Sequence, residues 1–253
     1  MNSEEKTIIH FTDSAAALKG ILSDGFRIKY CKECIWFGDV EKNLRVPMVS
    51  FCDIPIAQAK DHMKKYGHYA LGFTEEWADR NGMTKVNYLE RKSTLAANKI
   101  EALNFAITHA EQDPDETKLM KVLDELRYMK NYKGELWRKG VLQEEKYYFG
   151  DEHEWRYSPN TGHFYQFLYM EEMFTKRPDL ATLVQDLIAA ERLSFVAEDV
   201  RYILIEKEED RAELETHIRS LTKRFSEVER ENLVTKIRTA AQIEEESQSQ
   251  KSS

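Results

Sequence analysis

Short apolar runs alternate with helical patterns along the chain. The runs at residues 6–11, 46–52 and 69–73 are too short for helices and end in polar residues, which is typical of buried strands. Residues 200–205 form a further run of this kind, and residues 86–89 form a weaker one. Strands interleaved with helices in this way predict an α+β fold.

Helices are expected where apolar residues recur every three or four positions. Asp13 or Ser14 can cap the helix after the first strand, and Gly25 is the expected left-handed stop. Residues 56–66 and 179–193 show the same spacing. These helices would flank the strands and cover their apolar side chains.

The middle of the chain changes character. Residues 93–131 have helical spacing and no strand pattern, so this segment is expected to be a helical insertion. The sequence Asp113-Pro114-Asp115 marks the break between its two helices, because proline cannot continue the first but suits the start of the second. A strand pattern returns over residues 140–157.

Residue 206 is the predicted end of the main domain, which would comprise residues 1–206. Residues 207–243 are charge-rich with apolar residues at helical intervals, and we expect a C-terminal helical segment there. This segment either packs on its own domain, which is favoured, or offers a surface to a partner. Residues 244–253 are acidic and then rich in Ser and Gln, which predicts disorder.

The composition limits the possible functions. The chain has 253 residues, 42% of them apolar and 32% charged, which suits a globular protein with a sizeable core. A net charge of -8 disfavours general nucleic-acid binding. The basic residues of the 118–139 stretch are interleaved with Asp124, Glu125 and Glu135, so that stretch is interpreted as a solvated helix face.

The apolar runs are far shorter than a bilayer span, and residues 1–6 lack the features of a signal peptide. We therefore expect a cytoplasmic protein that makes no membrane contact. Three cysteines, an odd number, agree with a reducing compartment.

Metal chemistry is not favoured by the sequence. Cys31 and Cys34 form one CxxC pair, to which Cys52 and either His10 or His62 could add ligands. A structural zinc site usually needs two such pairs. Ordinary, partly buried cysteines are therefore the preferred interpretation, and no metal site is expected. The chain also lacks the motifs of P-loop, Rossmann, HExxH and GxSxG proteins.

Polar side chains at the ends of the apolar runs are the candidate functional residues. His10 and Thr12 are two positions apart on one strand, so their side chains share a face, and Ser50 and Cys52 repeat this relation on another. On spacing alone, a hydrogen-bonded core histidine is the commoner role for His10.

Glu154 is the candidate carboxylate, between His153 and Trp155-Arg156. A glutamate in apolar surroundings can stabilise a developing positive charge, as glycosyl-transfer chemistry requires. The alternative is a surface glutamate paired with Arg156 or Lys146. The residues alone leave these two roles open.

These segments together resemble the AbiGi family of bacterial abortive-infection proteins. The resemblance spans residues 6–206 and rests on several motifs: His10-Phe11-Thr12, Val46-Pro47-Met48-Val49-Ser50-Phe51-Cys52-Asp53-Ile54-Pro55, Tyr66-Gly67-His68-Tyr69-Ala70-Leu71-Gly72-Phe73-Thr74, Asp151-Glu152-His153-Glu154-Trp155-Arg156-Tyr157 and Asp199-Val200-Arg201-Tyr202-Ile203-Leu204-Ile205. It implies one component of a two-gene phage-exclusion system, often labelled the antitoxin, with a protein partner encoded nearby.

The order of the segments is also similar to that of the ADP-ribosyltransferase superfamily. This second resemblance implies a mixed or antiparallel sheet core, NAD as substrate and a protein or nucleic-acid target. By this analogy His10 and Thr12 would bind the nicotinamide side of NAD, and Glu154 together with His10 would be catalytic.

Ser50 falls where the superfamily has an aromatic residue. Stacking on nicotinamide would therefore come from Phe51, Tyr66 or Tyr69. The resemblance makes Ser50, Phe51 and Tyr69 cofactor-binding residues by analogy.

Two functions follow from these resemblances. The first is an enzyme that transfers ADP-ribose from NAD or hydrolyses NAD, and it requires His10 and Glu154 to share a cleft. The second is a non-catalytic antitoxin that binds a toxin partner.

Overall fold

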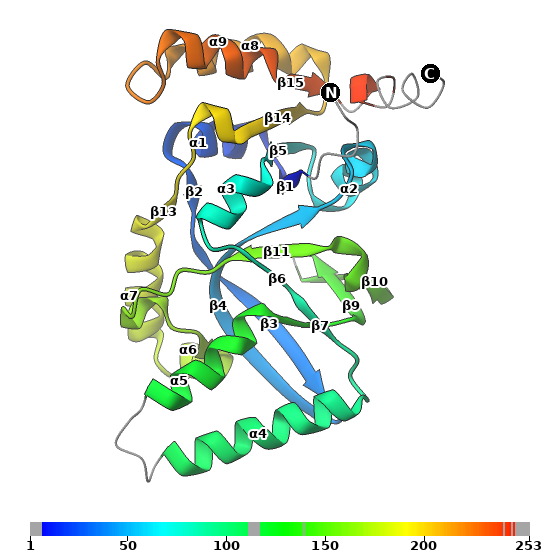
Figure 1. The fold of residues 1–253 in the computed structure, drawn as a ribbon, viewed down its shortest axis with the longest axis vertical. Coiled ribbons are helices and arrows are strands. Elements are labelled where there is room, and N and C mark those ends of the chain that lie inside the picture. Colours follow the sequence, from blue (N-terminus) through cyan, green and yellow to red (C-terminus); the bar gives the residue numbers. More distant parts are fainter. Residues whose placement is uncertain (1–6, 111–116, 139, 240, 244, 246–253) are drawn as a thin grey trace. The chain divides into compact units, whose positions relative to one another are not determined.

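The computed structural model describes residues 7–110, 117–138, 140–239, 241–243 and 245. The chain divides into two compact units. The first consists of Met1–Arg27, Ser50–Met83 and Arg192–Ser253, and the second of Ile28–Val49 and Thr84–Glu191. Each unit mixes helices with strands, so the protein is a mixed α/β structure (Figure 1).

The first unit is built on a mixed sheet. Its strands follow the order β15 (Ile237–Thr239), β14 (Val200–Ile205), β5 (Tyr69–Phe73), β1 (Ile8–Thr12) and the end of β4 (Val40–Asp53). Only the β14–β15 pair among these is parallel. A short antiparallel pair joins β2 (Phe26–Arg27) to β13 (Arg192–Leu193).

Helices of the first unit are α1 (Ala15–Asp24), α2 (Ala59–Tyr66), α3 (Glu75–Arg80), α8 (Arg211–Ser220) and α9 (Glu227–Thr235). Ser14 caps α1 by accepting a hydrogen bond from the Ala17 amide, and Gly25 ends it with a φ of 82°. The helices and strands enclose a core that includes Phe26, Phe73 and Trp77, all almost fully buried.

The second unit contains the remaining strand pairs. Strand β3 (Lys29–Phe37) pairs antiparallel with β4, which also pairs with β12 (Tyr169–Met170). The other pairs are β6 (Thr84–Lys85) with β11 (Glu154–Tyr157), β7 (Asn87–Leu89) with β8 (Met129–Asn131), and β9 (Lys133–Arg138) with β10 (Val141–Tyr148). Of these, β7–β8 and β9–β10 are separate two-stranded sheets.

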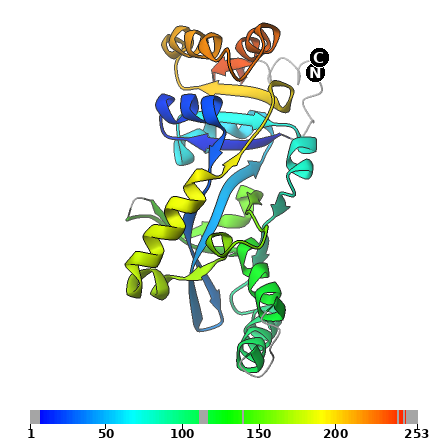
Figure 2. The same cartoon turned by 90° about the vertical axis from the view of Figure 1, so that its left-hand side faces the viewer.

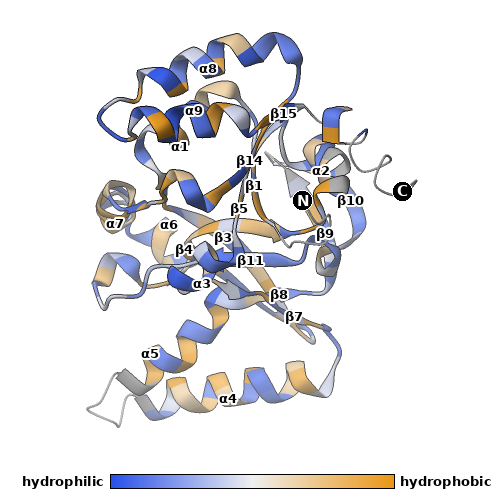
Figure 3. Ribbon diagram, turned by 45° about the horizontal axis from the view of Figure 1, so that its top comes forward, coloured by the Kyte–Doolittle hydropathy of each residue, from blue (hydrophilic) through white to orange (hydrophobic). Residues whose placement is uncertain are grey.

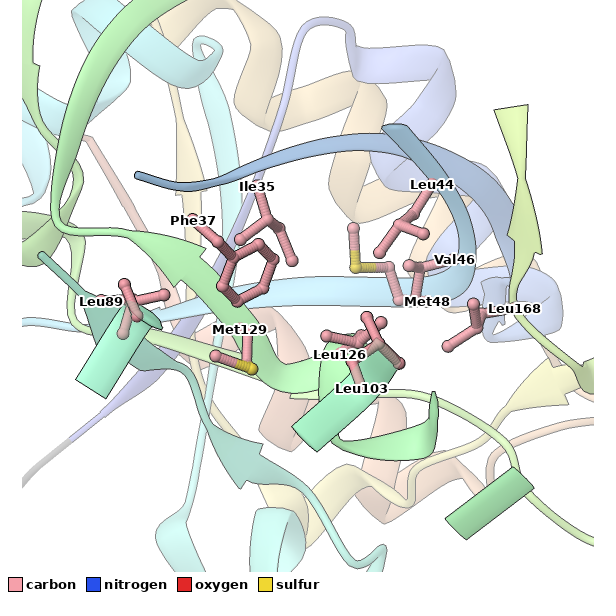
Figure 4. Packing of buried hydrophobic residues seen from close by; sticks show 11 residues of the cluster. Ile35, Phe37, Leu44, Val46, Met48, Leu89, Leu103, Leu126, Met129 and Leu168 are labelled. Atoms are coloured by element: carbon pink, nitrogen blue, oxygen red, sulfur yellow. The ribbon is translucent and has the colours of Figure 1, made fainter. Parts of the chain in front are cut away.

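Helices of the second unit are α4 (Thr94–Ala110), α5 (Thr117–Asp124), α6 (Glu171–Lys176) and α7 (Pro178–Ala190). The first two lie side by side (Figure 2). The apolar core of this unit gathers side chains from β3, β4, β7, β8, α4, η2 and the residue just before β12 (Figure 4): Ile35, Phe37, Leu44, Val46, Met48, Leu89, Leu103, Leu126, Met129 and Leu168.

Short 3₁₀ helices complete both units: η1 (Ile56–Gln58), η2 (Glu125–Tyr128), η3 (Phe149–Glu152), η4 (Phe164–Gln166), η5 (Ala197–Asp199) and η6 (Glu208–Asp210). No helix in the described ranges is long and apolar enough to cross a membrane.

The sequence pattern located most of these elements. The five apolar runs coincide with strands β1, β4, β5, β7 and β14. The two helices expected within residues 93–131 are α4 and α5. The predicted break at residues 113–115 lies outside the described residues, as does the tail after residue 243 apart from Glu245.

One strand was missed and one interpretation was wrong. Strand β3 was not predicted, although it pairs with β4 over its full length. The 118–139 stretch is not one solvated helix face, because α5 ends at Asp124 and the strands β8 and β9 follow.

The C-terminal segment packs on its own unit, as favoured from the sequence. Leu214 and Ile218 of α8 and Leu233 of α9 are buried, and α8 contacts α1. The last part of this segment adds β15 to the sheet. The boundary at residue 206 stays a prediction about which parts fold independently.

Candidate functional site

His10 and Thr12 lie on one face of the first unit's sheet, with Leu71 and Tyr69 opposite them on β5. The Nδ1 of His10 is 2.8 Å from the carbonyl oxygen of Ser50. Because a carbonyl oxygen only accepts, Nδ1 donates, and in the neutral ring Nε2 is then the acceptor nitrogen. This tautomer suits an oriented base and equally a core histidine that ties β1 to β4.

Ser50 and Phe51 do not present their side chains together. Cys52 pairs with Ile9 and Asp53 with Ile8, so the strand alternation puts the Phe51 side chain on the face of His10 and the Ser50 side chain on the other. Phe51 is 1% exposed. Its ring lies 5.5 Å from that of His10 and 5.4 Å from that of Trp77, so it belongs to an aromatic core.

Tyr69 is anchored by its hydroxyl group. The hydroxyl donates a hydrogen bond to the Asp210 Oδ2 at 2.9 Å. Burial and the Asp210 carboxylate raise the pKa of Tyr69 to about 12, so the phenol is protonated at neutral pH. Gly67, just before this strand, has a φ of 132°, and a Cβ there would lie 2.4 Å from the backbone of Thr12, so this position requires glycine.

Glu154 opens strand β11 in the second unit and is 5% exposed. Its Oε1 accepts a hydrogen bond from Arg156 Nε at 2.8 Å, and its Oε2 accepts one from Lys130 Nζ at 3.0 Å. Its backbone amide donates to the Tyr88 hydroxyl. Both carboxylate oxygens of Glu154 are therefore engaged by cations in a buried setting.

The partners of Glu154 extend into a buried ionic cluster. Arg156 also contacts Glu33 at 3.1 Å, and Lys130 also contacts Glu152 at 3.0 Å. We call Glu33, Lys130, Glu152, Glu154 and Arg156 the ionic cluster. It links β3, β8, η3 and β11.

Burial alone would lower the pKa of Lys130, but the carboxylates of Glu154 and Glu152 raise it above its usual value. The same balance raises the pKa of Arg156, through Glu154 and Glu33. Both cations are therefore charged at neutral pH. They form a fixed counter-charge for the carboxylates around them.

The cysteines do not form a metal site. Cys31 and Cys34 are three positions apart on β3, so their side chains point to opposite faces. Burial raises the pKa of Cys31 to about 11, and burial together with a hydrogen bond to Glu41 raises that of Cys34 to about 12. No group of three potential metal ligands occurs among the residues that the structure describes.

A hollow of about 140 Å³ lies between α4 and α5. Its lining is mainly apolar, and its charged members, Lys99 and Glu125, form an ion pair with each other. It therefore lacks the convergent polar groups expected of a cofactor site.

Sequence reasoning found part of this arrangement. The pairing of Glu154 with Arg156 was one of its two alternatives, but the pair is buried and its second cation is Lys130 instead of Lys146. Glu33 and Glu152 were missed. His10 and Glu154 belong to different units, and their convergence in one cleft stays a prediction.

Comparison with known proteins identifies the family. Residues 25–206 match the family model described as "Putative abortive phage resistance protein AbiGi, antitoxin". The "Abortive phage resistance protein AbiGi" of Lactococcus lactis subsp. cremoris is 26% identical over 225 residues, covering 81% of this chain and 90% of that protein. No solved structure matches. Because the family match spans well over half of the sequence, the chain belongs to the AbiGi family of abortive phage resistance proteins.

Proposed function

We propose that this chain serves abortive phage resistance as an antitoxin, which acts by binding a protein partner without catalysis. The family description and the name of the Lactococcus relative support the defence role. The proposal that the chain acts without catalysis rests on the contacts and burial of Glu154, the carboxylate that the sequence indicated for catalysis.

A catalytic carboxylate must offer an oxygen to its substrate. In Glu154, Arg156 occupies one oxygen and Lys130 the other, and the group is almost fully buried. If Glu154 turned away to contact a substrate, Arg156, which has no exposed surface, would lose one of its two carboxylate partners. Breaking a buried ion pair costs about 3–5 kcal/mol, so this arrangement favours a structural role for Glu154.

Co-expression with the product of the neighbouring gene tests the proposal. The neighbour alone is expected to arrest growth, and this chain is expected to restore growth and to co-purify with it. Glu154→Gln should retain this protection wherever the variant protein accumulates to the wild-type level. Growth arrest by this chain alone, relieved by Glu154→Gln, would overturn the antitoxin assignment.

Transfer of ADP-ribose from NAD is the second candidate. One observation favours it: His10 is held by Ser50 in an orientation that makes Nε2 an acceptor, with Thr12 on the same face of the sheet. Those two residues would hold the nicotinamide side of NAD. Phe51 is buried among other rings and Tyr69 is hydrogen-bonded to Asp210, so neither suits stacking on nicotinamide.

This second candidate is tested with labelled NAD, using the purified chain alone and with its partner. Nicotinamide release or protein labelling that Glu154→Gln and His10→Ala both abolish would establish the enzyme. Absence of turnover in every combination, with growth protection intact, would leave the antitoxin function.

A further inference from the structure

Helix α4 carries more apolar surface than its own unit covers. Its 17 residues include one lysine, Lys99, and one acidic residue, Glu101. Ala96 and Leu103 are buried against the core of the second unit. In Figure 3 apolar colour recurs along the whole helix. A surface helix normally turns its large apolar side chains toward the core, so large apolar residues elsewhere on α4 indicate a contact surface. One of them, Phe105, also stacks on the ring of His109 in the same helix, with 3.8 Å between the ring centroids.

The uncovered part forms a second stripe without charge. Leu95 is 55% exposed and Phe105 is 64% exposed, and the exposed Asn98 and Ala102 lie between them. These four residues, the α4 stripe, are spaced by three, four and three positions. That spacing places them in a single line on the helix and matches the seam of a helix pair.

We propose that the α4 stripe binds the α4 stripe of a second copy of this chain, in an antiparallel helix pair. The four positions are symmetric about residue 100, with large apolar side chains at 95 and 105 and small uncharged ones at 98 and 102. A two-fold axis at residue 100 places Leu95 opposite Phe105 of the other copy. Such a contact is self-complementary, as a symmetric dimer requires.

The sizes of the side chains fit this geometry. The same axis places Asn98 opposite Ala102 of the other copy, and these small residues allow the two helices to approach closely at their centre. Leu95 and Phe105 fill the space at both ends. A lone asparagine in the seam of a helix pair fixes the register of the pair and lowers its stability. Asn98 would have both effects here.

The charges beside the stripe weaken the contact with a second copy. Lys99 on one flank is already paired with Glu125, which leaves Glu101 as the charge on the other flank. In an antiparallel pair the two Glu101 side chains share that flank. Their repulsion is a second reason to expect a weak contact.

The contact is small. A helix of 17 residues is about 25 Å long, so two such helices bury less than the roughly 1,600 Å² of a standard stable interface. We therefore expect a reversible dimer with a dissociation constant of roughly 10–100 µM. This inference goes beyond the proposed function, and its test does not depend on the partner protein.

Sedimentation of the full chain from about 1 to 300 µM tests the proposal. The wild type is expected to show a monomer–dimer equilibrium. Phe105→Glu and Leu95→Glu should each weaken it at least tenfold, because each puts a charge into the seam. Asn98→Ala should strengthen it, because it removes the polar group from the seam, and Glu101→Gln should also strengthen it, because it removes a like-charge pair. Val228→Glu is the matched control: Val228 is 80% exposed on α9, and its substitution should leave the equilibrium unchanged.

Three results would overturn the proposal. They are a wild type that stays monomeric at the highest concentration, a dimer that neither Phe105→Glu nor Leu95→Glu weakens, and a dimer that Val228→Glu weakens equally. A monomeric chain whose complex with the neighbouring gene product is lost in Phe105→Glu would assign the α4 stripe to that partner instead. The substituted residues are exposed, so thermal unfolding of each variant should match the wild type.

Discussion

Substitution of Arg156 by methionine tests the role assigned to the ionic cluster. Arg156 has no exposed surface and donates to Glu154 and to the backbone carbonyl of Arg127, while it also contacts Glu33. Methionine preserves much of the length and apolar character of the side chain but none of its charge or donors. The variant therefore leaves the carboxylates in place and removes one of their two cations.

The expected size of the effect follows from the charges. The cluster holds three carboxylates and two cations, so its net charge is 2 − 3 = −1. Arg156→Met makes it 1 − 3 = −2, whereas Glu154→Gln makes it 2 − 2 = 0. Removing one partner of a buried pair costs about 3–5 kcal/mol. For a chain of this size that lowers Tm by about 6–20 °C in Arg156→Met. Glu154→Gln should lower the stability less, because it leaves the cluster without a net charge.

Differential scanning calorimetry of three variants checks this reasoning. Arg177→Met is the matched control, because Arg177 is 62% exposed and pairs with the equally accessible Asp179. Loss of such a surface pair should leave the unfolding temperature close to that of the wild type, because solvent screens the two charges. The reasoning is refuted by an Arg156→Met protein that unfolds at the same temperature as Arg177→Met, or by a Glu154→Gln protein that is the less stable of the two cluster variants.

Three further predictions concern other groups. The pKa of Lys130 in the folded chain is raised above 10.5, so the stability that this ammonium group contributes is complete below pH 10.5 and is lost as the pH rises further. In urea unfolding, the free energies of unfolding of the wild type and Lys130→Met should therefore converge above pH 10.5. Gly67→Ala should lower the free energy of unfolding by about 2 kcal/mol or more, because the new Cβ meets the Thr12 backbone. Gly82 also has a positive φ but open space around it, so Gly82→Ala should lower the stability less in thermal melts. The pKa of Cys31 is raised from 9.0 to about 11, which lowers its thiolate fraction at pH 8 about a hundredfold. Labelling of Cys31 by iodoacetamide, followed by mass spectrometry, should therefore be slow in the folded chain and fast in urea. Equal rates would contradict the burial of this thiol.

The sequence was sufficient for elements whose own pattern determines them. Strand β5 is apolar over all five of its residues, and α1 carries both its cap and its glycine stop. Strand β3 was missed because charged residues interrupt its alternation and its two cysteines suggested a metal motif. Strand β8 has three residues, and its pairing with β7 determines its conformation more than its composition does.

In the candidate site, too, the sequence predicted the local contacts but not those between distant strands. Glu154 and Arg156 are two positions apart on one strand, so their contact is local and the sequence indicated it. Lys130 comes from another strand, and no pattern in the sequence shows that it reaches Glu152 and Glu154. The bond from His10 to the Ser50 carbonyl likewise depends on the register between β1 and β4.

The motif Asp151–Tyr157 supported both resemblances, and the structure gives it a physical role that requires no reaction. Glu152, Glu154 and Arg156 lie at alternate positions and are all buried in the ionic cluster. A chain that folds this unit needs each of them paired, because an unpaired buried charge is costly. The presence of the motif therefore cannot by itself distinguish a catalytic glutamate from a structural one. Function separates the two: replacing a structural Glu154 by glutamine lowers Tm but leaves growth protection intact, whereas replacing a catalytic Glu154 abolishes turnover.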